Sequence, residues 1–369
     1  MILISIFIII LFCAEYTLLS QKGQRNLCFF LSLIITTIAG IRSVDTGFDY
    51  QQYISFINHI ENENNIISLL ENNFKLEPLF LLSSYTITNI FSLNLIFIFI
   101  LYSIAGVLLK AIAFNKLSPL PVISLLLYFQ SQYFYSDFAQ IRQSMAISFY
   151  LFSIYYLDNK RYTISFLFIT LAILSHYSAA ICLIMYPLKY IFERIRQTPL
   201  LFFLFSLLIT SIIFSFLELK LSLFLSQVIP FELFSDKITD YSKSEYSDAI
   251  EFGISDIIRM ATCILIYLVI IKKNKKSCLF ISYIYIVGCI IFFFLKNDGI
   301  LSSRATSYFK ILDCIILAEV IFQILLYKKT KIFLRNFFII SILITIYSIA
   351  SFYKNVVIVP EIYNYEVSL

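Results

Sequence analysis

Residues 92–114 read SLNLIFIFILYSIAGVLLKAIAF, an apolar stretch with one charged residue, Lys110. About 20 apolar residues in a helix cross the ~30 Å hydrocarbon core of a bilayer, so this stretch is predicted to be a transmembrane helix. Similar runs recur along the chain. We predict about twelve crossings, near residues 2–19, 27–41, 92–114, 119–135, 142–157, 162–176, 178–191, 199–217, 254–271, 277–295, 305–327 and 336–352.

The composition agrees with a polytopic membrane protein. Of the 369 residues, 60% are hydrophobic and 14% charged, and the mean hydropathy is +0.87. This excludes an ordinary soluble protein. The fold class we predict is all-α, as one integral membrane domain over 1–369. The formal charge of +5 does not indicate nucleic-acid binding, because the basic residues lie in short clusters between the spans.

The seven cysteines lie singly in or beside apolar runs, and the chain has two histidines. Without a C-x-x-C pair or neighbouring histidines, the cysteines are interpreted as small core residues, and a zinc or haem centre is not expected. We expect no metal site and no cofactor. The N-terminal apolar run lacks a basic region and a cleavage pattern, and is expected to be a retained helix.

The basic clusters between the predicted spans all fall on one side, which is cytoplasmic by the positive-inside rule. They are Lys22 and Arg25, Lys110 and Lys116, Lys160 and Arg161, Arg194 and Arg196, Lys272–Lys276, and Lys328–Arg335. The opposite face then receives two polar segments, about 42–91 and 218–253. Residues 77–91 and 221–234 are predicted to be interfacial or re-entrant helices within these segments.

Four arginines are predicted at outer helix ends: Arg42, Arg142, Arg259 and Arg304. Each alone is compatible with snorkelling to lipid headgroups. If they converge, they form a guanidinium cluster suited to bidentate binding of phosphate or pyrophosphate. Asp137 is a possible ion-pair partner of Arg142.

Polar side chains in the first outer segment have both a structural and a functional interpretation. Asp49 is placed to cap a helix, on which Tyr50 and Tyr53 share one face. Glu77 precedes Pro78 at another helix start. The functional interpretation is that these groups bind sugar hydroxyls or transfer a proton. His176, with an ordinary pKa of ~6.5, is the best-placed general base, although a hydrogen-bonded corner residue is the commoner role.

Acidic residues inside predicted spans are expected to face the bundle interior, because a lipid-facing charge is costly. They are Glu15, Asp313 and Glu319, and Lys310 is placed at i, i+3 to neutralise Asp313. These acids keep a proton-coupled transporter open as an alternative function.

The chain resembles the EpsG-type membrane proteins grouped with the Wzy-like polymerases of bacterial O-antigen, capsule and exopolysaccharide. The likeness rests on short motifs spread over most of the chain. They are Arg42 with Gly47-Phe48-Asp49-Tyr50-x-x-Tyr53, Glu77-Pro78-x-Phe80, Ile141-Arg142-Gln143-x-x-Ala146, His176-x-Ser178-Ala179 and Arg304-x-x-x-Tyr308-Phe309.

The resemblance implies the polymerisation of oligosaccharide repeat units on undecaprenyl pyrophosphate, at the periplasmic face of a bacterial inner membrane. A GT-C-like helical arrangement is compatible with it. Expected pyrophosphate ligands are Arg42, Arg142, Arg304 and, more weakly, Arg259. His176 or Asp49 is the expected base. Tyr50, Tyr53, Glu77 and Gln143 are the expected sugar contacts.

The expected partners are the lipid-linked glycan and membrane lipids, and the resemblance also allows a chain-length regulator protein. Two alternatives remain open at this point. One is a lipid-linked oligosaccharide flippase or another transporter, against which the lack of Gly/Pro-broken helices weighs modestly. The other is a membrane acyltransferase that modifies the same glycan.

Overall fold

The computed structural model describes residues 19–42, 49–61, 66–67, 69, 76–217, 219–221, 248–271 and 276–325. In these ranges the elements are helices, and no strand is among them. The predicted span 336–352, residues 2–18 of the first predicted span, Glu15, and most of segment 218–253 lie outside the described residues. The chain divides into two compact units, 1–177 with 317–369, and 178–316.

Unit 1 is built around three long helical stretches. α2 (Gln21–Gly40) begins after Ser20, whose Oγ accepts from the Gly23 amide at 3.3 Å. α6 (Ile96–Ser103), η3 (Ile104–Leu108) and α7 (Leu109–Leu117) form one continuous helix. α8 (Pro121–Tyr128) continues into η4 (Phe129–Ala139). These correspond to the predicted spans near 27–41, 92–114 and 119–135.

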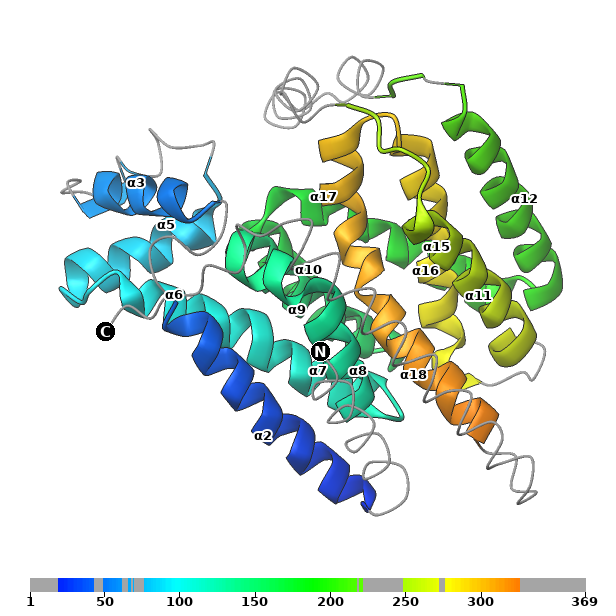
Figure 1. Cartoon of the computed structure of the whole chain (residues 1–369), viewed down its shortest axis with the longest axis horizontal. Coiled ribbons are helices and arrows are strands. Elements are labelled where there is room, and N and C mark those ends of the chain that lie inside the picture. Colours follow the sequence, from blue (N-terminus) through cyan, green and yellow to red (C-terminus); the bar gives the residue numbers. More distant parts are fainter. Residues whose placement is uncertain are drawn as a thin grey trace. The chain divides into compact units, whose positions relative to one another are not determined.

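α2 runs antiparallel beside the α6–α7 helix (Figure 1). Near one end, the Cys28 thiol lies 3.6 Å from the Pro121 carbonyl oxygen and 4.0 Å from that of Ala111. Near the other end, a Cβ atom added at Gly40 would lie 3.0 Å from Oγ of Ser103. The C-terminal end of α2, where Arg42 follows, therefore lies beside α6.

Shorter helices complete unit 1. α3 (Tyr50–Glu61) packs against α5 (Pro78–Tyr85), which η2 (Thr86–Ile90) extends. The helix 78–90 is shorter than a full crossing usually requires, and the interfacial or re-entrant role of 77–91 stays a prediction. α9 (Ile141–Asp158) and α10 (Tyr162–Ser175) form a closely packed pair. Ser153 and Ser165 join these two helices by reciprocal bonds to backbone carbonyls at 2.8 and 2.9 Å.

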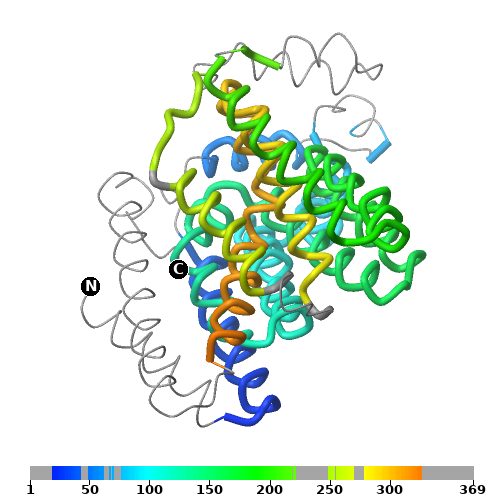
Figure 2. The backbone as a smooth tube through the Cα atoms, turned by 90° about the vertical axis from the view of Figure 1, so that its right-hand side faces the viewer, coloured from blue at the N-terminus to red at the C-terminus, as the bar shows by residue number. Residues whose placement is uncertain are grey.

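Unit 2 is also helical. It begins at the second residue of η5 (Tyr177–Ile184) and contains, in chain order, α11 (Met185–Arg194), α12 (Gln197–Ser215), α15 (Ile254–Leu265) with η6 (Ile266–Ile271), α16 (Lys276–Leu295) and α17 (Gly299–Lys310). The last described helix, α18 (Leu312–Leu325), begins in unit 2 and ends in unit 1. Figure 2 shows α12 in green beside α16 in yellow. α16 packs so closely on α17 that a Cβ atom at Gly288 would clash with the Phe309 side chain.

Among the described residues, three helices are long and apolar enough to cross a membrane: Ile96–Leu117, Gln197–Ser215 and Cys278–Leu295. An α-helical membrane protein is thereby supported, and the predicted total of about twelve crossings stays a prediction. Two predicted spans differ from expectation. The span 305–327 is interrupted at Ile311, between α17 and α18. Residues 178–191 begin in the 3₁₀ helix η5 and become α-helical only from Met185.

Candidate functional site

α3 presents two tyrosines on one buried face. The helix starts where the Tyr53 amide donates to the Asp49 carbonyl at 3.0 Å, as the predicted start at Asp49 requires. Tyr50 is 3% exposed and Tyr53 is 2% exposed, because residues at i and i+3 lie on one side of a helix. Tyr50 stacks on Phe99 with ring centroids 4.5 Å apart, and Tyr53 packs against Phe80 at 5.8 Å.

Arg142 and Glu77 form an ion pair beside Tyr53. Glu77 precedes Pro78, the first residue of α5, and Arg142 is the second residue of α9. Nη1 of Arg142 donates to Oε2 of Glu77, and their side chains are 15% and 2% exposed. The guanidinium also lies over the rings of Tyr53 at 5.3 Å and Phe80 at 5.4 Å.

Arg42 lies beside Tyr50, the other tyrosine of α3. Its Nη1 donates to the Ala39 carbonyl at 2.9 Å and to the Asp137 carbonyl at 2.8 Å. The guanidinium lies 5.0 Å from the ring of Phe99, 5.3 Å from that of Phe138 and 5.8 Å from that of Tyr50. Burial lowers the pKa of Arg42 to about 10, so the group is still cationic at neutral pH.

The phenols on α3 are neutral at physiological pH. Burial raises the pKa of Tyr53 above its usual value, although the Arg142 charge acts in the opposite direction. Burial likewise raises the pKa of Tyr50, with Arg42 opposing it. Both hydroxyls therefore keep a proton to donate. Two further phenols border this cluster: Tyr102, whose hydroxyl lies 3.1 Å from Oγ of Ser83, and Tyr177, whose hydroxyl bonds the Leu76 carbonyl at 3.4 Å.

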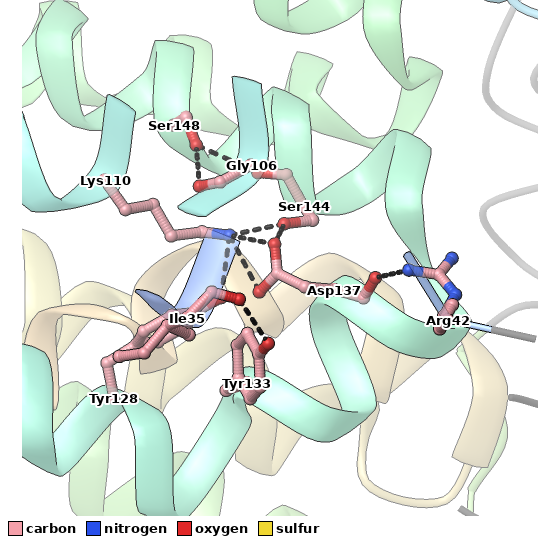
Figure 3. A network of polar contacts seen from close by, with 9 residues as sticks. All are labelled: Ile35, Arg42, Gly106, Lys110, Tyr128, Tyr133, Asp137, Ser144 and Ser148. Carbon is pink, nitrogen blue, oxygen red and sulfur yellow. Dashed lines mark hydrogen bonds and ion pairs between the residues drawn. The ribbon is translucent and has the colours of Figure 1, made fainter. Parts of the chain in front are cut away.

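The predicted pairing of Asp137 with Arg142 is wrong. Asp137 pairs with Lys110, whose Nζ lies 3.3 Å from Oδ1, and Arg142 pairs with Glu77 instead (Figure 3). The physical reason is that a lone lysine in an apolar helix is stabilised by a buried carboxylate. The Lys110 side chain is 0% exposed, and Lys116, six residues further on, is exposed. The cytoplasmic side predicted for both lysines stays a prediction.

His176 and Gln143 are buried in unit 1. His176 is 5% exposed and follows the last residue of α10, where its amide bonds the Ala172 carbonyl at 2.9 Å. Gln143 is 1% exposed on α9, next to Arg142. Their predicted roles stay predictions.

Of the predicted intramembrane acids, Glu319 is 3% exposed and accepts from Nε2 of Gln323 at 2.6 Å, and Asp313 is half-buried.

The other two predicted arginines belong to unit 2. Arg259 is ion-paired to Asp256 at 3.3 Å and lies 3.5 Å from the centroid of the Phe292 ring. Arg304 is half-buried on α17. Near it, Oγ of Ser178 and the hydroxyl of Tyr308 lie 3.0 Å apart, which joins two of the motifs quoted above. Convergence of all four arginines stays a prediction.

An apolar groove of about 650 Å³ lies beside the tyrosine cluster. One wall comes from α5 and η2, including Leu79, Ser83 and Ile87, and the other from α6, including Phe97 and Leu101. Ser83 is the residue that contacts Tyr102. The groove therefore offers an apolar surface beside the polar cluster.

Sequence reasoning missed several members of this region. Lys110, Ser144 and Tyr128 form a buried network around Asp137, and Tyr102 and Tyr177 border the Glu77–Arg142 pair. The available signal was the single lysine in the apolar run 92–114 together with the single aspartate in the aromatic run 128–138. Within the described residues, no group of three or more His, Cys, Asp or Glu side chains is arranged to hold a metal ion.

Fold and site together define an α-helical membrane protein in which separate motifs place two guanidinium groups and a carboxylate around buried tyrosines. The model of the EpsG family matches residues 25–367, and the chain belongs to this family. It is also 27% identical over 202 residues to amylovoran biosynthesis protein AmsC of Erwinia amylovora, covering 52% of this chain and 53% of that protein. The chain thus spans about half the length of this relative. No solved structure matches.

Proposed function

We propose that this protein is a membrane glycosyltransferase of the Wzy type, which polymerises oligosaccharide repeat units carried on undecaprenyl pyrophosphate. Its product would be O-antigen or a related surface polysaccharide. The observation that carries the proposal is the convergence of Arg42, Arg142 and Glu77 on the tyrosine face of α3. Membership of the EpsG family, and similarity to a protein of amylovoran biosynthesis, support polysaccharide synthesis as the process.

The diphosphate of the lipid carrier is the group that needs cations. Guanidinium groups bind phosphate oxygens through paired N–H donors, and in a site with little water such bonds stabilise a departing anion strongly. Arg142 is suited to this role because Glu77 and Tyr53 both hold its guanidinium in place, and its buried Nε has no hydrogen-bond partner among the described residues. Arg42 supplies a second positive charge on the same helix face.

The reaction transfers one glycan chain to a hydroxyl of the next lipid-linked unit. The bond between the anomeric carbon and the pyrophosphate oxygen breaks, and a bond from that carbon to the acceptor oxygen forms. Undecaprenyl pyrophosphate leaves with the bonding electron pair. The acceptor proton passes to a base, for which we propose His176, with Asp49 as the second candidate.

The remaining groups suit the other parts of the substrate. The neutral phenols of Tyr50 and Tyr53, with Gln143, are proposed to contact sugar rings and hydroxyls. Glu77 orients Arg142 and is also a proposed sugar contact. The groove between α5 and α6 is proposed to hold the isoprenoid chain, because its walls are apolar and it adjoins the cationic groups. The basic clusters of the sequence favour the periplasmic face for this site.

Chain growth by the purified protein tests the proposal. The full chain in lipid nanodiscs is given only the lipid-linked repeat unit, and products are resolved by length on a gel. We expect polymers with the wild type and with Arg161→Lys, an exposed residue in the α9–α10 turn. We expect about a 100-fold lower rate with Arg42→Lys, because lysine replaces the planar fork by a point charge.

The result distinguishes the alternatives left open by the sequence. A nanodisc has no second compartment, so chain growth in it is chemistry and not transport. If folded wild-type protein leaves the lipid-linked repeat unit unextended, the proposal that the protein is a polymerase is wrong. Equal rates for Arg42→Lys and Arg161→Lys would remove Arg42 from the diphosphate site.

A further inference from the structure

A buried network of polar side chains lies beside Arg42 in unit 1 (Figure 3). Nζ of Lys110 donates to the Tyr128 hydroxyl at 3.0 Å, to Oδ1 of Asp137 at 3.3 Å and to Oγ of Ser144. Ser144 in turn donates to Oδ1 of Asp137. The ammonium group thus directs its three donors to three different elements, α8, η4 and α9.

This network is sealed from solvent. The Lys110 and Asp137 side chains are 0% and 1% exposed, and Ser144 is 1% exposed. Burying two charges costs several kcal/mol per ion, and apolar side chains of similar volume often give equal or better stability. Stability alone is therefore a weak reason for a charged pair at this place, and a positional role is the better explanation.

Gly106 leaves room for this network because it has no side chain. A Cβ atom added at Gly106 would lie 2.7 Å from Oγ of Ser144 and closer still to Oδ1 of Asp137. Oγ of Ser148 bonds the Gly106 carbonyl at 2.7 Å, which holds this segment against α9. Gly106 lies in the π-helix η3 and Asp137 lies in the π-helix η4. Single-turn π-segments such as the five-residue η3 are frequent at functional sites.

Asp137 connects this network to Arg42. Its carboxylate is held by Lys110 and Ser144, and its backbone carbonyl accepts from Nη1 of Arg42 at 2.8 Å. One turn earlier on η4, the Tyr133 hydroxyl donates to the Ile35 carbonyl of α2 at 2.7 Å. Two hydrogen bonds, Tyr133 to Ile35 and Arg42 to Asp137, therefore connect the C-terminal part of α2 to η4. The buried Lys110–Asp137 ion pair fixes the orientation of η4 at Asp137.

We infer that Lys110, Asp137 and Ser144 are positioning residues that set the guanidinium of Arg42 for its anionic ligand. This inference depends on one part of the proposed function, namely that Arg42 binds the diphosphate of the substrate. None of the three side chains touches the substrate. Asp137→Asn keeps the carbonyl that Arg42 uses and removes the charge that Lys110 uses, so it isolates the positioning effect.

Affinity for farnesyl pyrophosphate, a short polyprenyl diphosphate, is the measurement. Binding to the full chain in nanodiscs is compared for wild type, Asp137→Asn, Arg42→Lys and the double variant. We expect Asp137→Asn to weaken binding about tenfold in the wild type and less than twofold in the Arg42→Lys background, because a positioning residue acts only through the group it positions. Equal losses in both backgrounds would overturn the inference.

Two further variants keep the test decisive if Asp137→Asn folds poorly. Lys110→Met combined with Asp137→Leu removes both charges without leaving one unpaired, and we expect the same tenfold loss of affinity with a melting temperature near that of the wild type. Ser165→Ala is the control for loss of a buried polar bond, and we expect it to bind as the wild type does. Wild-type affinity in the charge-free variant contradicts positioning. If the wild type neither binds the probe nor extends chains, the proposed function itself fails, and that outcome is visible without any variant.

Discussion

Two arginine–carboxylate pairs occupy comparable surroundings in the two units. Arg142 in unit 1 pairs with Glu77 and lies over Tyr53, and Arg259 in unit 2 pairs with Asp256 and lies over Phe292. The carboxylates are 2% and 0% exposed, and the arginine side chains are 15% and 14% exposed. Burial and ion pairing alone therefore do not separate a functional arginine from a structural one.

The difference lies in what else each carboxylate holds. Asp256 also accepts from Nζ of Lys296 at 2.7 Å and from the Gly253 amide at 3.0 Å, so it closes the start of α15 and ties it to the end of α16. Its partner Arg259 is only three residues away. Glu77 and Arg142 are 65 residues apart and have phenols around them. From this comparison we propose that Asp256 and Arg259 serve mainly to stabilise the fold, and that Glu77 and Arg142 are arranged for a ligand.

Arg142→Ala would break the unit 1 side of the comparison and has the largest expected effect. Loss of a charge-assisted donor at a developing anion lowers rates by about 10²–10³-fold, and the variant also leaves Glu77 buried without its cation. We expect chain growth in nanodiscs to fall below detection. Arg142→Lys keeps a charge for Glu77 and should retain a trace of activity at near wild-type melting temperature. Wild-type activity in either variant would remove Arg142 from the site.

His176→Ala tests the proposed base and should disturb the protein less broadly than Arg142→Ala, because it leaves the Glu77–Arg142 ion pair intact. A general base contributes about 10²–10⁴-fold to a rate, so we expect at least a 100-fold loss of the maximal rate with little change in the substrate concentration at half-maximal rate. The dependence of the wild-type rate on pH should show a limb that disappears in His176→Ala. If the limb persists in this variant and is lost in Asp49→Asn, then Asp49 is the base.

The features predicted correctly from sequence are those that depend on local spacing. The shared face of Tyr50 and Tyr53, the helix start at Glu77-Pro78, and the apolar helix predicted over 92–114 and observed as Ile96–Leu117 each follow from periodicity, capping or hydropathy along a short stretch of chain. Order along the chain also suggested that distant motifs belong together, and the motifs around Arg42, Tyr53, Glu77 and Arg142 do meet in unit 1.

The choice of ionic partners was not predictable in the same way. Asp137 is five residues from Arg142 and 27 from Lys110, and short separation favoured the wrong pair. The packing of α7 against α8, and the π-turns in η3 and η4, decide which charges face each other. Such turns alter the angular position of every following side chain, and the helical period of 3.6 residues does not include them.

Asp256→Asn should change stability and leave chemistry largely intact. The substitution leaves the buried Lys296 and Arg259 without their carboxylate, and breaking a buried pair in this way costs about 3–5 kcal/mol. We expect a clearly lower melting temperature in nanodiscs, measured by loss of helical circular dichroism. At a temperature where the variant is folded, chain growth per folded molecule should stay within about threefold of wild type. A much larger loss in the folded variant would place Asp256 in the active site and erase the distinction between the two pairs.

Arg259→Lys has the smallest expected effect and sharpens the comparison most directly, because the same exchange at Arg142 is expected to be severe. A lysine at 259 keeps the positive charge beside Asp256, which Lys296 already neutralises at 2.7 Å. The exchange loses mainly the stacking of the guanidinium on Phe292, worth about 0.5–2 kcal/mol. We expect a slightly lower melting temperature, a chain-growth rate within about twofold of wild type, and unchanged affinity for farnesyl pyrophosphate. If Arg259→Lys binds the diphosphate more weakly at an unchanged melting temperature, Arg259 contacts the substrate. It would then have the same role as the one proposed for Arg142.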